Sequence, residues 1–294
     1  MTDPTTHTLD LPGVTLTYDI RGDLTEATAD RPALLLAASP MGASGFPTLA
    51  GHFTDRPVIT YDPRGVERSV RSDGAGELTP EQHAADLHAL LQALDLPAVD
   101  VFASSGGAVN ALCLVSAHPD EVRTLVAHEP PAAAALPDAG PALAVCEDIY
   151  QTYQHEGMGP AMARFIAISS HQGPVPEDYL DGPAPDPAAF GLPTEDDGTR
   201  DDPLVGQNIR TITAYRPDVP ALTTTATRVV FAVGEESGEE LAARAGRAVA
   251  AAIGTEPVLF PGSHAGFLGQ EYGPEMAGRP DEFAAALRRV LDGR

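Results

Sequence analysis

Ser105 lies in a run of small residues that could present a serine hydroxyl for nucleophilic attack. Residues 99–112 read as a strand that passes directly into a helix through a tight turn. Such a turn forces strained backbone angles on its central residue and brings neighbouring backbones together, so the positions two before and two after it must be small. Ala103 and Gly107 occupy these positions around Ser105. The spacing therefore predicts that Ser105 is a nucleophile.

The neighbouring serine, Ser104, fits the same turn less well. Centring the turn on Ser104 would put Phe102 at a crowded position, where its ring should clash. With Ser105 at the centre, the Gly106 N–H lies at a helix N-terminus, where it can donate a hydrogen bond to an oxyanion. Small-residue turns also join strands to helices without any catalytic role.

Metal ligation has little support in the sequence. His83 and His88 are five residues apart on an expected helix, which is a poor spacing for one face. There is no His-Glu-x-x-His motif and no pair of closely spaced cysteines. We expect no metal centre and no cofactor.

The elements that must position Ser105 alternate between short apolar strands and longer Ala-rich helices, which is typical of a mostly parallel sheet with crossover helices. The expected strands are residues 14–20, 33–38, 58–61, 98–103, 122–128, 228–233 and 257–260. The expected helices are residues 80–94, 107–117, 238–253 and 280–291.

The alternation is interrupted between residues 130 and 217, where no strand pattern occurs. Two helices are expected there, at residues 142–154 and 158–169. Residues 172–203 carry nine carboxylates and one Arg, and a loop this long is more often a lid or a binding loop than a connector, although a passive surface loop remains open. The predicted organisation is a core of residues 1–131, a helical cap of residues 132–216 and a second core part of residues 217–294.

Two further segments resemble the α/β-hydrolase superfamily, and the resemblance extends from about residue 13 to residue 292. Residues 33–46 are similar to the strand and loop that usually read His-Gly-x-Pro. Residues 58–69 are similar to the segment that usually reads Asp-x-Arg-Gly-x-Gly-x-Ser. The resemblance implies an α/β-hydrolase fold and a site built around the serine turn.

Both segments depart from the usual pattern. Ala37 and Ala38 stand where His-Gly is expected, and Glu67 replaces the usual Gly. In the superfamily the first loop supplies the second amide of the oxyanion hole. Aligning this loop on Pro40 places that amide at the backbone of Ser39, and an alignment shifted by one or two residues stays open.

The resemblance also implies a general base, a His on the loop after the last strand. His264 follows the strand that ends at Phe260 and stands among small residues before the final helix. It is the histidine of this chain that combines this position with the resemblance.

Two carboxylates are candidates for the acid that would orient His264. Most of the superfamily carries an Asp after the strand at residues 228–233, but this chain has Ser237 there, with Glu236 beside it. Some branches, including certain haloalkane dehalogenases and zearalenone-type lactonases, take the acid from the end of the strand after the nucleophile helix. Glu129 has that position, at a sheet edge where ligands bind, so we favour Glu129 over Glu236.

These residues predict a serine hydrolase that cleaves a carboxylic ester or lactone of a hydrophobic small molecule through an acyl-enzyme. A serine nucleophile disfavours a dehalogenase or epoxide hydrolase, which use Asp at this position. The alternatives are a non-catalytic ligand-binding protein, or a cofactor-free lyase or perhydrolase using the same site. The expected pocket-lining residues are Met41, Tyr153, Met162, Phe165 and Phe267.

Charge and composition limit the partners and the compartment. The 294 residues carry 18 basic and 42 acidic side chains, a formal net charge of −24, so nucleic acid and anionic membranes are unfavourable partners. Cys113 and Cys146 cannot form a disulfide framework, and residues 1–10 do not resemble a secretory signal. We expect a cytoplasmic protein without a membrane span, whose apolar helix faces serve either its core or a homodimer.

Overall fold

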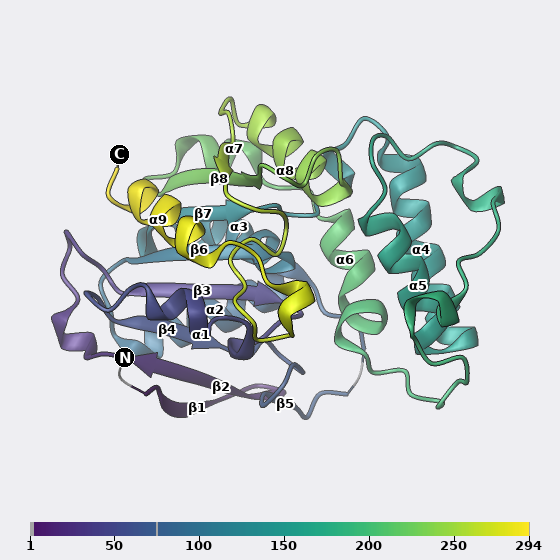
Figure 1. Cartoon of the computed structure of the whole chain (residues 1–294). Coiled ribbons are helices and arrows are strands. Elements are labelled where there is room, and N and C mark those ends of the chain that lie inside the picture. Colours follow the sequence, from purple (N-terminus) through teal and green to yellow (C-terminus); the bar gives the residue numbers. More distant parts are fainter. Residues whose placement is uncertain (1–2, 75, 294) are drawn as a thin grey trace.

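The computed structural model describes residues 3–74 and 76–293, which are built around one β-sheet (Figure 1). The strands in these residues are β1 (Thr5–Leu11), β2 (Val14–Arg21), β3 (Leu34–Ser39), β4 (Val58–Tyr61), β5 (Val70–Arg71), β6 (Val99–Ser105), β7 (Val122–His128), β8 (Arg228–Gly234) and β9 (Val258–Phe260).

The sheet order is β1-β2-β4-β3-β6-β7-β8-β9, with β5 paired to β2. All neighbours from β4 to β9 along this order are parallel, whereas β1, β2 and β5 pair antiparallel at one side. Parallel strands end at the same edge of a sheet, and ligands bind outside those carboxyl ends. The register of β3 against β6 places Ser39 opposite Ser105 at this edge.

Helices cover both faces of the sheet because its central strands are apolar on both sides. The helices packed on the sheet are α1 (Pro47–Gly51), α2 (Pro80–Leu94), α3 (Gly106–Ala117), α8 (Leu241–Ala252) and α9 (Pro280–Leu291). Leu34 and Leu36 of β3 pack into the core cluster that contains α1 and α9. Leu35 and Ala37 point the other way, into the cluster that contains α2 and α3. The period of two in β3 thus builds both layers of the core.

The segment between β7 and β8 forms helices with a core of their own. They are α4 (Ala139–Glu156), α5 (Met158–Ser169), α6 (Ile209–Ala214) and α7 (Val219–Thr224). Ile149 and Tyr153 of α4 pack with Ala161 of α5 and Ile209 of α6 in a separate apolar cluster. Figure 1 shows α4 and α5 beyond the carboxyl ends of the strands, with α6 between them and the sheet. The division into core and cap at residues 132 and 216 stays a prediction.

The expected alternation of strands and helices is confirmed, with additions at its margins. The strand β1 was not predicted, because its residues Thr5–Leu11 are mostly polar and lie exposed or half-buried at the sheet edge. The helix α4 begins three residues before its predicted start, since Pro141 lies in its first turn, where a proline removes no helical hydrogen bond. Within the part of the chain that is described, no helix is both long and apolar enough to cross a membrane.

A buried ion cluster joins β6 to the loop before β4 and to the start of β7. The carboxylate of Asp100 is fully buried and lies 2.6 Å from the guanidinium groups of both Arg56 and Arg123.

Asp100→Asn should therefore cost about 3 to 5 kcal/mol of unfolding free energy, because it leaves a buried guanidinium without its counter-charge. Urea unfolding measures the loss. Asp55→Asn is the matched control, since Asp55 pairs with Arg288 at 2.9 Å on the surface and should cost at most about 1 kcal/mol. Equal losses in the two variants would contradict this account.

Candidate active site

Ser105 has a strained backbone at the junction of β6 and α3. Its φ of 56° and ψ of −132° lie in a region that residues with a side chain rarely adopt. Strain of this kind costs about 1 to 3 kcal/mol and persists only where the surrounding structure imposes it. Here it turns the chain sharply between the strand and the helix, and Ser105 lines a cavity at the sheet edge.

The small residues around Ser105 are required by the close approach of β3. A Cβ atom on Gly107 would lie 2.5 Å from the Cα of Ala38, and one on Gly106 would lie 2.8 Å from the backbone oxygen of Ser39. Ser104 does not line the cavity; its Oγ is buried and lies 3.0 Å from Nδ1 of His128. The turn is therefore centred on Ser105.

His264 lines the same cavity and is held by Glu129. Nδ1 of His264 lies 2.6 Å from Oε2 of Glu129, within hydrogen-bond distance. Burial favours a raised pKa for Glu129, but the hydrogen bond from His264 and the nearby imidazoles outweigh it and lower the pKa to about 2. Burial likewise favours a lowered pKa for His264, yet the hydrogen bond and charge of Glu129 raise that pKa above 6.5. The pair is thus a carboxylate that stays ionised and an imidazole made more basic.

Glu129, and not Glu236, is the carboxylate beside His264. Glu129 follows β7 with a φ of 46°, its side chain is fully buried, and its Oε1 accepts a hydrogen bond of 2.8 Å from the Gly234 N–H. The side chain of Glu236 is exposed and lies 3.3 Å from Arg279. Ser237, which stands where most of the superfamily carries its acid, is buried.

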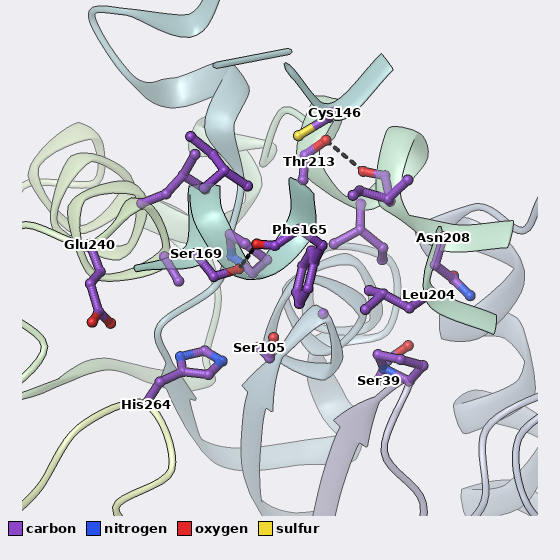
Figure 2. Close-up of a pocket in the computed structure, with 18 residues that line it drawn as sticks. Ser39, Ser105, Cys146, Phe165, Ser169, Leu204, Asn208, Thr213, Glu240 and His264 are labelled. Carbon is purple, nitrogen blue, oxygen red and sulfur yellow. Dashed lines mark hydrogen bonds between the residues drawn. The ribbon is translucent and has the colours of Figure 1, made fainter. Parts of the chain in front are cut away.

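Ser39 and Gly106 both line the cavity beside Ser105, and Figure 2 shows Ser105 between His264 and Ser39. Ser39 is the last residue of β3 and lies opposite Ser105 in the β3–β6 register. Their backbones are thus next to the serine, where the donors of an oxyanion hole are needed.

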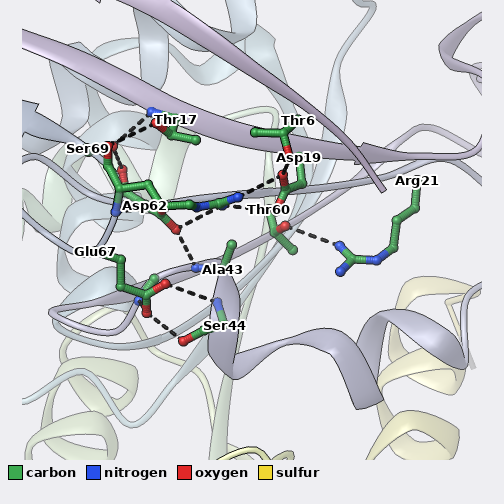
Figure 3. A network of polar contacts seen from close by, with 12 residues as sticks. Thr6, Thr17, Asp19, Arg21, Ala43, Ser44, Thr60, Asp62, Glu67 and Ser69 are labelled. Carbon is green, nitrogen blue, oxygen red and sulfur yellow. Dashed lines mark hydrogen bonds and ion pairs between the residues drawn. The ribbon is translucent and has the colours of Figure 1, made fainter. Parts of the chain in front are cut away.

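The loop after β3 is fixed by two carboxylates from the segment after β4 (Figure 3). Glu67 accepts hydrogen bonds from the Ser44 hydroxyl at 2.6 Å and from the Gly42 N–H at 3.1 Å. Asp62 accepts one of 2.8 Å from the Ala43 N–H. Glu67 has a φ of 47°, a conformation that suits the glycine of the usual motif. The carboxylate that replaces this glycine holds the loop that follows Ser39.

The cavity has a volume of about 210 Å³ and is apolar above the reactive groups. The apolar side chains that line it are Pro40, Pro131, Cys146, Phe165, Ile168, Leu204, Ile209, Ile212, Leu241 and Ala242. Most of them come from the helical segment between β7 and β8. The acidic loop at residues 172–203 does not contribute to the lining.

Of the side chains expected to line the pocket, Phe165 does so, whereas Met41, Tyr153, Met162 and Phe267 do not. Tyr153 is fully buried, and its hydroxyl accepts a hydrogen bond of 3.0 Å from the backbone of residue 202. Phe267 stacks on Phe46, with ring centroids 5.5 Å apart, in the core beneath the site. Met162 packs into the cluster of α4 and α5, and Met41 packs into the core cluster beside α1.

Four lining residues with polar side chains were not predicted from the sequence, namely Ser169, Asn208, Thr213 and Glu240. Asn208 and Thr213 had no motif to indicate them, because they come from short helices in the irregular segment. Glu240 ends a stretch with four glutamates, residues 235–240, ahead of α8, and a helix dipole favours acidic residues there without any role in a cavity.

One cluster among the described residues has the composition of a metal site, away from the cavity. His88 of α2, His118 after α3 and Glu121 bring their possible ligand atoms within 4.8 Å of one another. The two imidazole rings, however, are stacked at 3.7 Å with an interplanar angle of 7°. Nitrogen lone pairs in parallel stacked rings do not converge on one ion, so this arrangement does not form a ligand set.

Comparison with known proteins agrees with this architecture. A family model described as α/β-hydrolase fold matches residues 35–179. The uncharacterized hydrolase YraK of Bacillus subtilis is 29% identical over 268 residues, covering 88% of this chain and 89% of YraK. A thermophilic esterase from Thermogutta terrifontis matches in structure with a TM-score of 0.64 and 19% identity, covering 99% of each chain. The enol-lactonase of Burkholderia xenovorans gives a TM-score of 0.64 and 19% identity, over 97% of this chain and 99% of the lactonase. The family model and the solved structures therefore agree that the chain has the α/β-hydrolase fold.

Proposed function

We propose that this protein is a serine hydrolase that cleaves a carboxylic ester or lactone of a hydrophobic small molecule. The observation that carries the proposal is the arrangement of Ser105, His264 and Glu129. Ser105 and His264 line one cavity, and the carboxylate of Glu129 lies 2.6 Å from Nδ1 of His264. A nucleophile, a base and a group that orients the base are the three parts that acyl transfer requires.

In the proposed reaction, the Ser105 hydroxyl attacks the ester carbonyl carbon while His264 takes its proton. Nδ1 of His264 is engaged by Glu129, so Nε2 is the nitrogen available for that proton. The backbone N–H groups of Gly106 and Ser39 stabilise the negative carbonyl oxygen of the tetrahedral intermediate. His264 then protonates the departing alcohol, which leaves the acyl group on Ser105. In the second step His264 takes a proton from a water molecule, which attacks the acyl-enzyme and restores Ser105.

Several features support an ester or lactone as the substrate. The cavity walls are apolar, which suits a hydrophobic acyl or alcohol group. A serine at the turn forms an acyl-enzyme rather than the alkyl-enzyme ester that an Asp would form. The esterase and the enol-lactonase share the fold over nearly the whole chain. We propose that residues 132–216 act as the cap, because Phe165, Ile168 and Leu204 line the cavity from that segment.

Replacing the nucleophile tests the proposal directly. We expect the wild type to hydrolyse p-nitrophenyl esters over a range of acyl chain lengths, and Ser105→Ala to lower kcat/KM by at least about 10³. The matched control is Ser104→Ala, which removes the neighbouring hydroxyl that does not line the cavity and should retain most of the activity. Hydrolysis that persists in Ser105→Ala, or no turnover of any ester or lactone by the wild type, would contradict the proposal.

Replacing the acid tests the assignment of Glu129. Glu129→Gln keeps the shape of the side chain but removes its charge, so kcat should fall by about 10² to 10⁴. Glu236→Gln makes the same chemical change at an exposed site and should alter kcat by less than about twofold. A larger loss in Glu236→Gln than in Glu129→Gln would transfer the role to Glu236.

The pH profile gives an independent reading of the same pair. His264 acts as a base only when neutral, so kcat/KM should fall as the pH drops through the pKa of His264. Glu129 raises that pKa above 6.5, so activity is retained at pH values above it. Glu129→Gln should shift the acidic limb of the profile to lower pH, measured as kcat/KM from about pH 5 to pH 9. An unchanged limb would show that Glu129 does not act on the base.

A further inference from the structure

One charged group in the cavity has no role in the proposed reaction. Glu240 lines the cavity at the start of α8, together with Leu241 and Ala242. Figure 2 shows its carboxylate on the same side of the cavity as His264. The chain has no Lys, and none of the residues that line the cavity is Arg, so His264 is the lining side chain that can carry a positive charge.

The other polar side chains of the walls are already engaged within the protein. Asn208, Ser169 and Thr213 form hydrogen bonds of 2.6 to 2.8 Å with neighbouring side-chain or backbone groups. They offer a substrate little beyond shape. Apart from the groups assigned to the reaction, Glu240 is therefore the strongest polar feature that a ligand would meet.

Glu240 is not explained by the structure of the helix that follows it. It is the N-cap residue of α8, but its side chain makes no capping hydrogen bond. No hydrogen bond or ion pair engages its carboxylate within residues 3–74 and 76–293. The nearest arginines of α8 are committed elsewhere, because Arg244 pairs with Asp138 and Arg247 lies 3.6 Å from Glu239.

The surroundings of Glu240 make its charge costly when the cavity is empty. Burial raises the pKa of this half-buried carboxyl, and the negative charge of Glu129 raises it further, whereas the charge of His264 acts in the opposite direction. A positive group in the cavity would offset both effects, since opposite charges a few ångströms apart in a partly dry site attract strongly. A negative group would instead be repelled by the carboxylate of Glu240 in the cavity wall.

We propose that Glu240 is a binding subsite for a positively charged nitrogen on the substrate. The inference rests on the proposed function and refines it: the substrate class is an ester or lactone that combines an apolar body with a cationic amine or ammonium group. The apolar walls bind the body, Ser105 and His264 act on the carbonyl, and Glu240 selects for the charge. Esters that carry a carboxylate are disfavoured because the negative charge of Glu240 repels them.

A pair of isosteric esters tests the subsite. A choline ester and the corresponding 3,3-dimethylbutyl ester have nearly the same shape, but only the choline ester carries a positive charge. With the acyl chain that the p-nitrophenyl series favours, and at a pH on the plateau of the measured kcat/KM profile, the wild type should prefer the choline ester by at least about tenfold in kcat/KM. Glu240→Gln should reduce this preference to about onefold, through a higher KM for the choline ester and a change of less than about threefold for the neutral one.

Glu239→Gln is the matched control, because it removes the same charge from the preceding residue, whose side chain is exposed and does not line the cavity. This variant should keep the wild-type preference. If the neutral ester is hydrolysed through Ser105 but the wild type shows no preference, or Glu240→Gln retains it, the subsite is overturned and the hydrolase proposal stands. If neither ester is hydrolysed and the p-nitrophenyl esters are also inert, the proposed function fails and the subsite fails with it.

Discussion

Between the end of β3 and the start of α3 there is no room for a side chain, because a Cβ on Gly107 would lie 2.5 Å from the Cα of Ala38. This close approach is what the candidate site depends on. It allows the chain to turn sharply enough at Ser105 for a residue with a φ of 56° to be held between a strand and a helix. The same approach places Ser39 beside the serine, so the proposed nucleophile and the proposed oxyanion donors come from one contact between backbones.

The parallel sheet gathers the remaining groups at the same edge. Glu129 follows β7, and His264 follows β9, two strands away in the sheet order. A fully buried carboxylate is costly unless it is hydrogen-bonded, and Glu129 receives hydrogen bonds from His264 at 2.6 Å and from the Gly234 N–H at 2.8 Å. Because the carboxylate beside His264 follows β7, the proposed reaction does not need an acid after β8, where Ser237 stands. The segment after β8 then supplies Glu240 to the cavity wall instead.

Residues whose position follows from local geometry could be predicted from the sequence. The spacing of small residues around Ser105 reports a backbone contact, and the place of His264 after a strand follows from the order of the elements. Tyr153 could not be placed, because an apolar residue on a helix looks the same in sequence whether it faces a neighbouring helix or a cavity. The role of Glu67 depends on a loop more than twenty residues away in the chain, a contact that its own sequence neighbours do not indicate. The polar strand β1 was not predicted because an exposed edge strand has little apolar periodicity.

The proposed mechanism has one nucleophilic atom, the Ser105 hydroxyl oxygen. Covalent labelling of that oxygen is the most direct test of the mechanism. A fluorophosphonate reacts with a serine only where a base and an oxyanion hole activate it. The wild type treated with the probe and digested should carry the phosphonyl group on Ser105, Ser104→Ala should be labelled equally, and Ser105→Ala should carry no label. Label on Ser104 or Ser39, or a wild type that stays unmodified while it hydrolyses esters, would contradict the assignment.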